Sequence, residues 1–189
     1  MARHGPVVVP YDPAWPRAFE AERALLEQVL APWLSKGIEH VGSTAVPGLA
    51  AKPIIDMVAG VRDLGEARAA FGLLSALGYT HREHRPEAHS LHKPGAGEWW
   101  EETHHLHLTE PGSDLWRERL AFRDSLRADP SLADEYAEWK SRHAAANDSS
   151  NPYRADKRPF IARVLAEVGI HIKPDSERLS APALRQRHP

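Results

Sequence analysis

The stretch that decides the fold is residues 40–57, which read HVGSTAVPGLAAKPIIDM. It passes through a loop rich in glycine and proline into an apolar run whose one charge is Asp56. Glycine directly after a strand lets the backbone approach a phosphate closely, and Ser43 adds a hydroxyl and an N–H, so Gly42-Ser43 can form an anion-binding turn. Because a bare carboxylate is costly to bury, we expect Asp56 to face a cleft, a cation such as Lys52, or a metal.

These residues allow two interpretations. Phosphoryl transfer needs a phosphate cradle, carboxylates for Mg²⁺ and basic side chains that neutralise charge. Ser43 and Thr44 would supply the cradle, Lys52 the positive charge, and Asp56 the carboxylate. The alternative is a tight turn with a structural Asp56 salt bridge, because a carboxylate at such a place indicates a site only statistically.

Hydrophobic periodicity around this stretch predicts an α+β fold. Helices are expected over residues 13–34, with a kink or a short second piece at Pro32, and over residues 63–77, behind a capping box of Asp63 and Glu66. Three further helices are expected over residues 114–127, 131–146 and 151–168. Strands are expected over residues 38–41, 54–61, 79–82, 89–92 and 105–109. We therefore predict a core over residues 1–112 with a small mixed sheet and helices on one side, a helical unit over 113–169 packed on it, and a mobile tail over 170–189.

Length and composition fit one globular domain with a helical appendage. The 189 residues carry a net charge of −2, which argues against nucleic acid as a partner, and hold no cysteine, which excludes disulfides and thiolate metal sites. No apolar run approaches the ~20 residues of a membrane span or the length of a secretory signal, so we expect a cytoplasmic protein with no membrane partner. The oligomeric state is left open.

The stretch 40–57 resembles the Gly-Ser…Asp signature of the polymerase-β-like nucleotidyltransferase superfamily. More closely, residues 8–168 resemble the GrpB family, also called UPF0157. The pieces that carry this resemblance are Tyr11-Asp12-Pro13-Ala14-Trp15 with Phe19, residues 40–56, Leu106-His107-Leu108, Trp116, Phe122-Arg123-Asp124, Leu126-Arg127, Tyr136, Lys140, Tyr153, Lys157 and Phe160-Ile161. The resemblance implies a nucleotidyltransferase-like mixed β-sheet flanked by helices. It also implies a nucleotide or another phosphate-bearing ligand, including coenzyme A-related metabolites, because a similar module is fused behind dephospho-coenzyme A kinase in some bacteria.

The sequence departs from the superfamily pattern at the metal-binding carboxylates. Transferases of that class carry Asp-x-Asp or Asp-x-Glu on the strand and a third carboxylate on a neighbouring strand. Here Val58 stands at the second position, and the later strand offers His105 and His107. One carboxylate cannot hold two Mg²⁺ ions, and imidazoles replace the oxygen ligands of Mg²⁺ poorly. Whether the protein transfers nucleotides is therefore left open.

The histidine-rich later strand suggests a different divalent metal. His105 and His107 project to one face of a strand, and with Asp56 they form a two-His, one-carboxylate set that suits Zn²⁺, Fe²⁺ or Mn²⁺. The expected cofactor is therefore a divalent metal, with Mg²⁺, Mn²⁺ and Zn²⁺ as the candidates. Two alternatives remain. The histidines could only form hydrogen bonds on a polar sheet face, or they could hold a phosphate without a metal.

Basic and aromatic side chains of the C-terminal helices complete the predicted site. Four of them are expected to face the Gly-Ser turn and stabilise a phosphate, namely Arg123, Lys140, Tyr153 and Lys157, with a solvated surface as the alternative. The leading hypothesis is a protein that binds a phosphate-bearing small molecule, with Asp56, Lys52 and His107 as candidate catalytic residues. The other hypotheses are a metal-dependent hydrolase that uses Asp56, His105 and His107, and a non-catalytic binding module.

Overall fold

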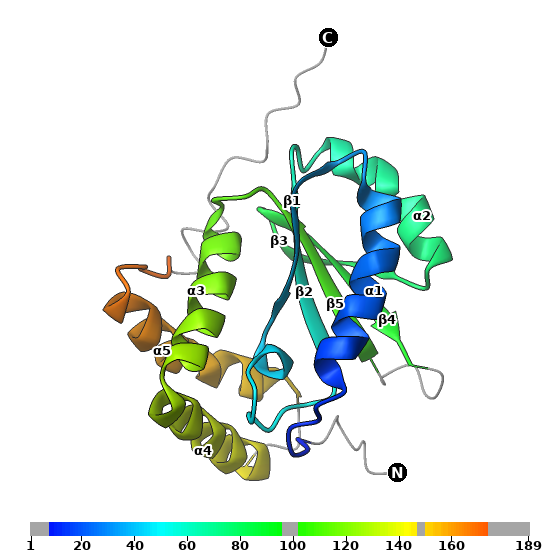
Figure 1. Ribbon diagram of the computed structural model, residues 1–189. Helices are drawn as coiled ribbons and strands as arrows, with labels where there is room; N and C mark the ends of the chain where they lie inside the picture. Colours follow the sequence, from blue (N-terminus) through cyan, green and yellow to red (C-terminus); the bar gives the residue numbers. More distant parts are fainter. Residues whose placement is uncertain (1–7, 96–101, 147–149, 174–189) are drawn as a thin grey trace.

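A five-stranded mixed sheet forms the centre of the protein (Figure 1). The computed structural model describes residues 8–95, 102–146 and 150–173, although the side chains of residues 83–84, 143–146 and 150–156 lie outside that description. The strands are β1 Leu34–Val41, β2 Ile55–Val61, β3 Thr80–Arg85, β4 Ala88–Pro94 and β5 Glu102–Thr109, in the spatial order β1-β2-β5-β4-β3. β2 and β5 run parallel, and the other neighbouring strands are antiparallel. The predicted α+β class is therefore confirmed.

Helices cover both faces of this sheet. α1 (Trp15–Leu30), the 3-10 helix η2 (Glu66–Ala70) and α2 (Phe71–Ala76) lie on one side. α3 (Asp114–Ala128), α4 (Pro130–Ala146) and α5 (Ser150–Glu167) lie on the other (Figure 1). Because side chains alternate along a strand, Ile55 and Met57 of β2 join the apolar core beneath α1, whereas Asp56 and Val58 face α3.

The first helix ends earlier than the sequence predicts. It stops at Leu30, and the chain enters β1 at Leu34, so neither a kink nor a second helical piece forms at Pro32 and the predicted end at residue 34 is wrong. Proline lacks an N–H and clashes with the carbonyl four residues before it, which favours ending the helix over bending it. The N–H of Trp33 instead returns to the carbonyl of Leu30 at 2.9 Å.

The predicted helix over residues 63–77 forms as two shorter pieces, η2 followed by α2. One half of the predicted capping box is present, since Asp63 Oδ1 accepts a hydrogen bond from the backbone N–H of Glu66 at 2.8 Å, although η2 itself begins after Gly65. The three C-terminal helices are confirmed to within a few residues, and α3 is capped by the hydroxyl of Ser113, which accepts from the N–H of Trp116.

The helical unit packs directly on the loop that follows β1. An apolar cluster joins Val46 and Leu49 of this loop to Leu126 of α3, Tyr136 of α4 and Phe160 of α5. The loop over residues 42–53 is therefore held between the end of the sheet and all three C-terminal helices. Side chains from each of these helices can reach the turn at its start.

Candidate functional site

The turn after β1 lies directly against Asp56. Gly42 has a φ of 73° and a ψ of −172°, a backbone conformation open essentially only to glycine. A Cβ placed on Gly42 would lie 2.5 Å from Asp56 Oδ2, which is a clash. Ser43 then opens the short 3-10 helix η1 (Ser43–Ala45). The structure thus brings the predicted Gly-Ser turn and the predicted carboxylate into contact.

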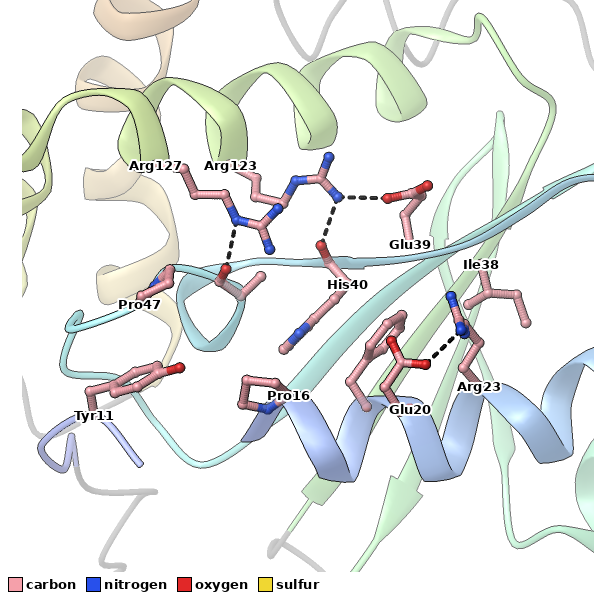
Figure 2. Close-up of a pocket in the computed structure, with 12 residues that line it drawn as sticks. Tyr11, Pro16, Glu20, Arg23, Ile38, Glu39, His40, Pro47, Arg123 and Arg127 are labelled. Atoms are coloured by element: carbon pink, nitrogen blue, oxygen red, sulfur yellow. Dashed lines mark hydrogen bonds and ion pairs between the residues drawn. The ribbon is translucent and has the colours of Figure 1, made fainter. Parts of the chain in front are cut away.

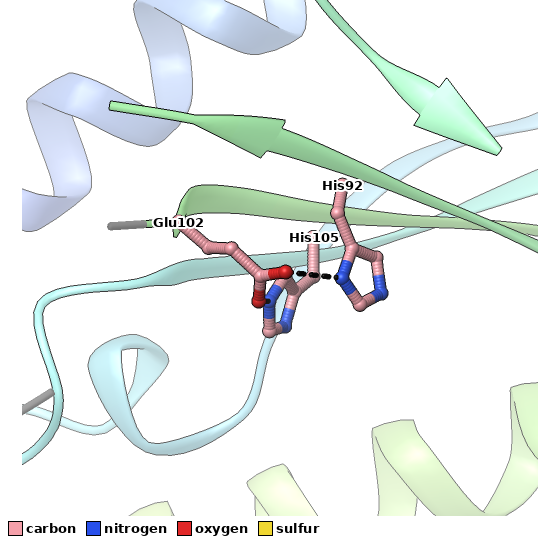
Figure 3. Close-up of side chains that lie close together, drawn as sticks. All are labelled: His92, Glu102 and His105. Atoms are coloured by element: carbon pink, nitrogen blue, oxygen red, sulfur yellow. Dashed lines mark hydrogen bonds and ion pairs between the residues drawn. The ribbon is translucent and has the colours of Figure 1, made fainter. Parts of the chain in front are cut away.

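Asp56 begins a chain of four hydrogen-bonded side chains. Asp56 Oδ1 and His105 Nδ1 are 2.9 Å apart, and His105 Nε2 lies 2.7 Å from Glu102 Oε2. Glu102 Oε1 is in turn 2.9 Å from His92 Nδ1 (Figure 3). The side chains of His105 and Asp56 are 14% and 25% exposed, so the chain opens only partly to solvent. Two carboxylates and two imidazoles therefore alternate across β2, β5 and β4.

Hydrogen bonding sets the charges along this chain. Burial acts to raise the pKa of Asp56, but the hydrogen bond and charge of His105, helped by Arg119, hold it well below its usual range. The hydrogen bond from His105 lowers the pKa of Glu102 to about 2, against the effect of burial. Burial acts to lower the pKa of His105, but hydrogen bonds to both carboxylates raise it to about 9. In these protonation states His105 is an imidazolium between two carboxylates near neutral pH.

Positive side chains from the loop and from each C-terminal helix gather beside the turn. Lys140 of α4 is 2% exposed, its Nζ lies 3.4 Å from Ser43 Oγ, and it donates to the carbonyl of Ala50. Burial lowers the pKa of Lys140 to about 8. Burial, followed by repulsion from Lys52, also lowers the pKa of Lys157 of α5 to about 7.

The charges that act on Lys157 define the rest of this group. Besides Lys52, they are those of Asp56, which favours the ammonium form, and of Lys140 and Arg119, which oppose it. We call the assembly the Asp56 cluster, and its members are Gly42, Ser43, Lys52, Asp56, His105, Arg119, Lys140 and Lys157. Three lysines and an arginine thus join the Gly-Ser turn, Asp56 and the His105 imidazolium in one group, an arrangement suited to an anionic ligand.

Two predicted site residues are buried and bonded to other groups. The Thr44 hydroxyl donates to the carbonyl of Ile54 at 3.0 Å and accepts from His40 Nε2 at 3.0 Å, and Thr44 is 1% exposed. His107 is 4% exposed, with its Nδ1 2.9 Å from the hydroxyl of Ser90. Both are close to the Asp56 cluster in the chain, and their roles in binding or catalysis stay predictions.

Arg123 lines a separate pocket along the edge strand β1. The pocket has a volume of about 320 Å³ and lies between α1 and the C-terminal part of α3. Figure 2 shows Arg123 donating to Glu39 Oε2 and to the carbonyl of His40, at 2.8 and 3.0 Å. Arg127 Nε donates to the carbonyl of Ala45 at 2.9 Å. Both arginines therefore fasten α3 to β1 and η1. The side chain of Tyr153, the remaining predicted phosphate contact, lies outside the described residues.

Glu102 and Arg119 belong to the site, although the sequence interpretation does not include them. Strict alternation would place Glu102 on the sheet face opposite His105, but the pairing register shifts between Lys93 and Pro94, opposite this part of β5. Such an irregularity re-aims a side chain, and here it brings Glu102 back to the face of His105. Arg119 lies in a polar helix, where arginines are mostly exposed to solvent. The local sequence therefore does not indicate that Arg119 belongs to the site.

The fold and the Asp56 cluster define an α+β protein in which a glycine-serine turn, the strand carboxylate Asp56 and several cations come together. The sequence model described as GrpB protein matches residues 6–167. This chain belongs to the GrpB family.

Within residues 8–95, 102–146 and 150–173, no helix has both the length and the apolar character needed to cross a membrane.

Individual relatives agree with this membership. The chain is 34% identical over 167 residues to the glutamate-rich protein GrpB of Alkalihalophilus pseudofirmus, which covers 86% of this chain and 95% of the relative. It is 36% identical over 155 residues to the UPF0157 protein YqkA of Bacillus subtilis, covering 82% of this chain but only 44% of that relative's length. It also resembles the solved GrpB structure from Enterococcus faecalis with a TM-score of 0.77 and 33% identity, covering 85% of this chain and 96% of the other.

Proposed function

We propose that this GrpB-family protein binds a phosphate-bearing small molecule, a nucleotide or a coenzyme A-related metabolite, at the Asp56 cluster. In this proposal the Gly42-Ser43 turn receives a phosphate group. Lys140 and Lys157 neutralise its charge from the helical side, and Lys52 from the loop. A cytoplasmic location would suit such a ligand.

The observation that carries the proposal is the contact between Lys140 and the turn. A buried ammonium lies 3.4 Å from the hydroxyl of Ser43, and a second lysine with a lowered pKa, Lys157, lies within electrostatic reach of it. Holding several cations close together disfavours their charged forms, so the arrangement is costly for the protein alone. A phosphate bound between Ser43 and these lysines would offset that cost through charge-assisted hydrogen bonds.

The choice of ligand class rests on two further points. A relative from Mycolicibacterium paratuberculosis is named dephospho-CoA kinase, and this chain is 30% identical to it over 186 residues, covering 45% of its length. The Gly-Ser…Asp stretch also resembles that of nucleotidyltransferases. Both comparisons favour a ligand that carries a nucleoside and a pyrophosphate over a simple inorganic anion.

The site supports binding more directly than nucleotidyl transfer. A general base should have a pKa near the working pH, and the pKa of Asp56 is held far below it. Val58 follows where a second metal-binding carboxylate would stand, and its side chain is fully buried in an apolar cluster with Val41 and Leu115. Asp56 therefore suits the orientation of His105 and the balancing of nearby cations better than proton abstraction.

A thermal-shift screen tests the proposal. Purified protein is heated with ATP, GTP, CTP, UTP, coenzyme A and dephospho-coenzyme A, with and without Mg²⁺ or Mn²⁺. We expect at least one of these to raise Tm in the wild type and not in the Lys140→Met variant. An exposed control, Lys36→Met, should respond as the wild type does. If none of these ligands raises the Tm of the wild type, the proposal fails.

The second candidate function is metal-dependent hydrolysis. The observation that favours it is the pairing of Asp56 with His105, next to further nitrogen and oxygen ligands on β4 and β5. Hydrolysis of phosphate esters should then appear when Zn²⁺, Mn²⁺ or Fe²⁺ is added to metal-stripped protein. No bound metal after gentle purification, together with no activation on adding these ions, would exclude this function.

A further inference from the structure

We propose that His92, Glu102 and His105 form a binding site for Zn²⁺, with Asp56 holding His105 in the orientation that the metal needs. The site uses three ligands from two strands, β4 and β5, and differs from the Asp56, His105 and His107 set expected from the sequence. It does not depend on the proposed phosphate ligand.

Geometry is the first argument. One ligand atom from each of His92, Glu102 and His105 lies within 4.8 Å of the other two. His92 and His105 are directly opposite each other in the β4–β5 ladder, and their rings stack with centroids 4.2 Å apart. Figure 3 shows the Glu102 carboxylate reaching over to both rings from the start of β5. Side-chain exposures of 12%, 22% and 14% place all three in a partly enclosed position that ions can still reach.

The hydrogen bond between Asp56 and His105 is the second argument. A histidine that binds a metal through one ring nitrogen usually donates the other N–H to a carboxylate, which fixes the tautomer and the ring orientation. Asp56 Oδ1 lies 2.9 Å from His105 Nδ1, so this carboxylate occupies that supporting position. The remaining nitrogen, Nε2, points at Glu102 Oε2 from 2.7 Å.

Metal binding at this place replaces protons. Without a metal, a proton on His105 Nε2 bridges to Glu102, and His92 Nδ1 is bonded to the other oxygen of the same carboxylate. Zn²⁺ would take the lone pair of His105 Nε2, whose proton leaves to solvent. His92 would bind through Nδ1 once the proton of that nitrogen leaves to solvent and, in the neutral ring, Nε2 carries the N–H instead. Zn²⁺ bonds to nitrogen and oxygen are about 2.0–2.2 Å, so the ligand atoms need to separate by about half an ångström to reach tetrahedral spacing.

The ligand types select the metal. Two imidazoles and one carboxylate match the three-ligand sets of catalytic Zn²⁺ sites, which leave one position open, whereas Mg²⁺ prefers oxygen ligands. Arg82 is the neighbouring cation that could compete, since its Nη2 lies 3.5 Å from Glu102 Oε1. Its side chain is 51% exposed and can turn away into solvent.

The test is titration of the full, untagged chain with Zn²⁺ alone, followed by metal analysis after dialysis. Loss of a supporting carboxylate costs about tenfold to a hundredfold in metal affinity, and loss of a ligand costs more. We therefore expect one Zn²⁺ per chain and a weakening of more than about a hundredfold in each of His92→Ala, Glu102→Gln and His105→Ala. Asp56→Asn should weaken binding less, because Asp56 supports a ligand and is not one. His81→Ala, an exposed histidine on the neighbouring strand β3, is the matched control and should bind as the wild type does.

Two further measurements keep the outcome decisive. Circular dichroism of each variant shows that it is folded, and Co²⁺ as a spectroscopic substitute should give the visible bands of a four-coordinate site that His105→Ala loses. Absence of Zn²⁺ binding in the wild type would overturn the proposal. So would an affinity for Zn²⁺ equal to that of the wild type in the three folded ligand variants. Because no nucleotide is present, neither result depends on the phosphate ligand proposed above.

Discussion

The two faces of the sheet are built from alternate residues of the same strands, yet they differ in kind. Toward α1 the sheet presents Met57 and Leu106, both fully buried in one apolar core. Toward α3 the adjacent residues Asp56 and His105 begin a chain of charged and polar groups. The alternation of a β-strand therefore places structural and candidate functional residues one position apart.

Charged groups on the two faces are also balanced differently. Near the α1 face, the carboxylate of Glu22 accepts from Lys93 Nζ at 2.9 and 3.0 Å and from the Tyr79 hydroxyl at 3.0 Å, so acid and base satisfy each other. Beside the α3 face, burial lowers the pKa of Lys157, and the charges of Lys52, Lys140 and Arg119 lower it further. Charged groups that neutralise one another are typical of a structural role. Charged groups with shifted pKa values are more typical of a functional site.

The largest expected effect is a loss of stability from a substitution on the α1 face of the sheet. Met57→Ala should lower the free energy of unfolding by about 2–5 kcal/mol, because it empties a fully buried position in the apolar core. Urea denaturation followed by circular dichroism measures this. Ligand affinity per folded molecule should be unchanged, and a large loss of affinity would show that the two faces are not separate in function.

The next effect tests the contact between the turn and Asp56. Gly42→Ala should cost about 1–3 kcal/mol through its backbone conformation alone, and the clash with Asp56 Oδ2 adds to this. Gly48→Ala is the matched control, since Gly48 also has a positive φ but a Cβ there would meet nothing within 4 Å. Equal destabilisation of the two variants in thermal unfolding would contradict the close approach of Gly42 to Asp56.

A smaller effect should appear in binding without a loss of stability. Lys157→Met removes an ammonium group whose pKa burial lowers to about 7, so Tm should stay equal or rise. Affinity for the nucleotide or coenzyme A found in the thermal-shift screen should fall by at least about tenfold, which is about 1.4 kcal/mol. Calorimetric titration measures both the wild type and the variant. A variant that is less stable but binds normally would make Lys157 a structural residue.

The smallest effect concerns pH. Lysines bind phosphate when protonated. Burial lowers the pKa of Lys140 to about 8. Burial, with the charges of Lys52, Lys140 and Arg119 and against the attraction of Asp56, lowers the pKa of Lys157 to about 7. Affinity should therefore fall several-fold between about pH 7 and about pH 9, a range in which a phosphate group with a second pKa near 6 keeps its charge. Lys157→Met should show a flatter profile. A profile that rises with pH in the wild type would contradict this assignment.

The sequence predicted the fold where a single periodic pattern decides the structure. Ile55 and Met57 alternate with Asp56, and this pattern correctly indicated a buried strand with one polar position. The close approach of Gly42 to Asp56 is a finding of the structure, because the sequence indicated only that Asp56 faces a cleft, a cation or a metal. The early end of the first helix was missed because the pattern of apolar residues continues past Leu30 to Trp33.

The rest of the site depends on tertiary contacts that no local pattern carries. Glu102 lies on the same face as His105 because the pairing register of β4 and β5 shifts beside it. The two-residue alternation of side chains along a strand cannot reveal such a shift. The charge of Arg119 acts on Asp56 because α3 crosses that face of the sheet. Lys140 and Lys157 are expected from the family resemblance, and the burial of Lys140 beside the turn comes from the packing of α4 and α5 on Val46 and Leu49.

A crystal structure of the protein with the ligand that gives the largest thermal shift tests the central claim most directly. The account predicts a phosphate group within hydrogen-bonding distance of Ser43 and of Lys140 or Lys157, beside Asp56. A ligand bound instead in the pocket along β1, with its phosphate on Arg123 and Arg127, would contradict the assignment of the Asp56 cluster as the binding site.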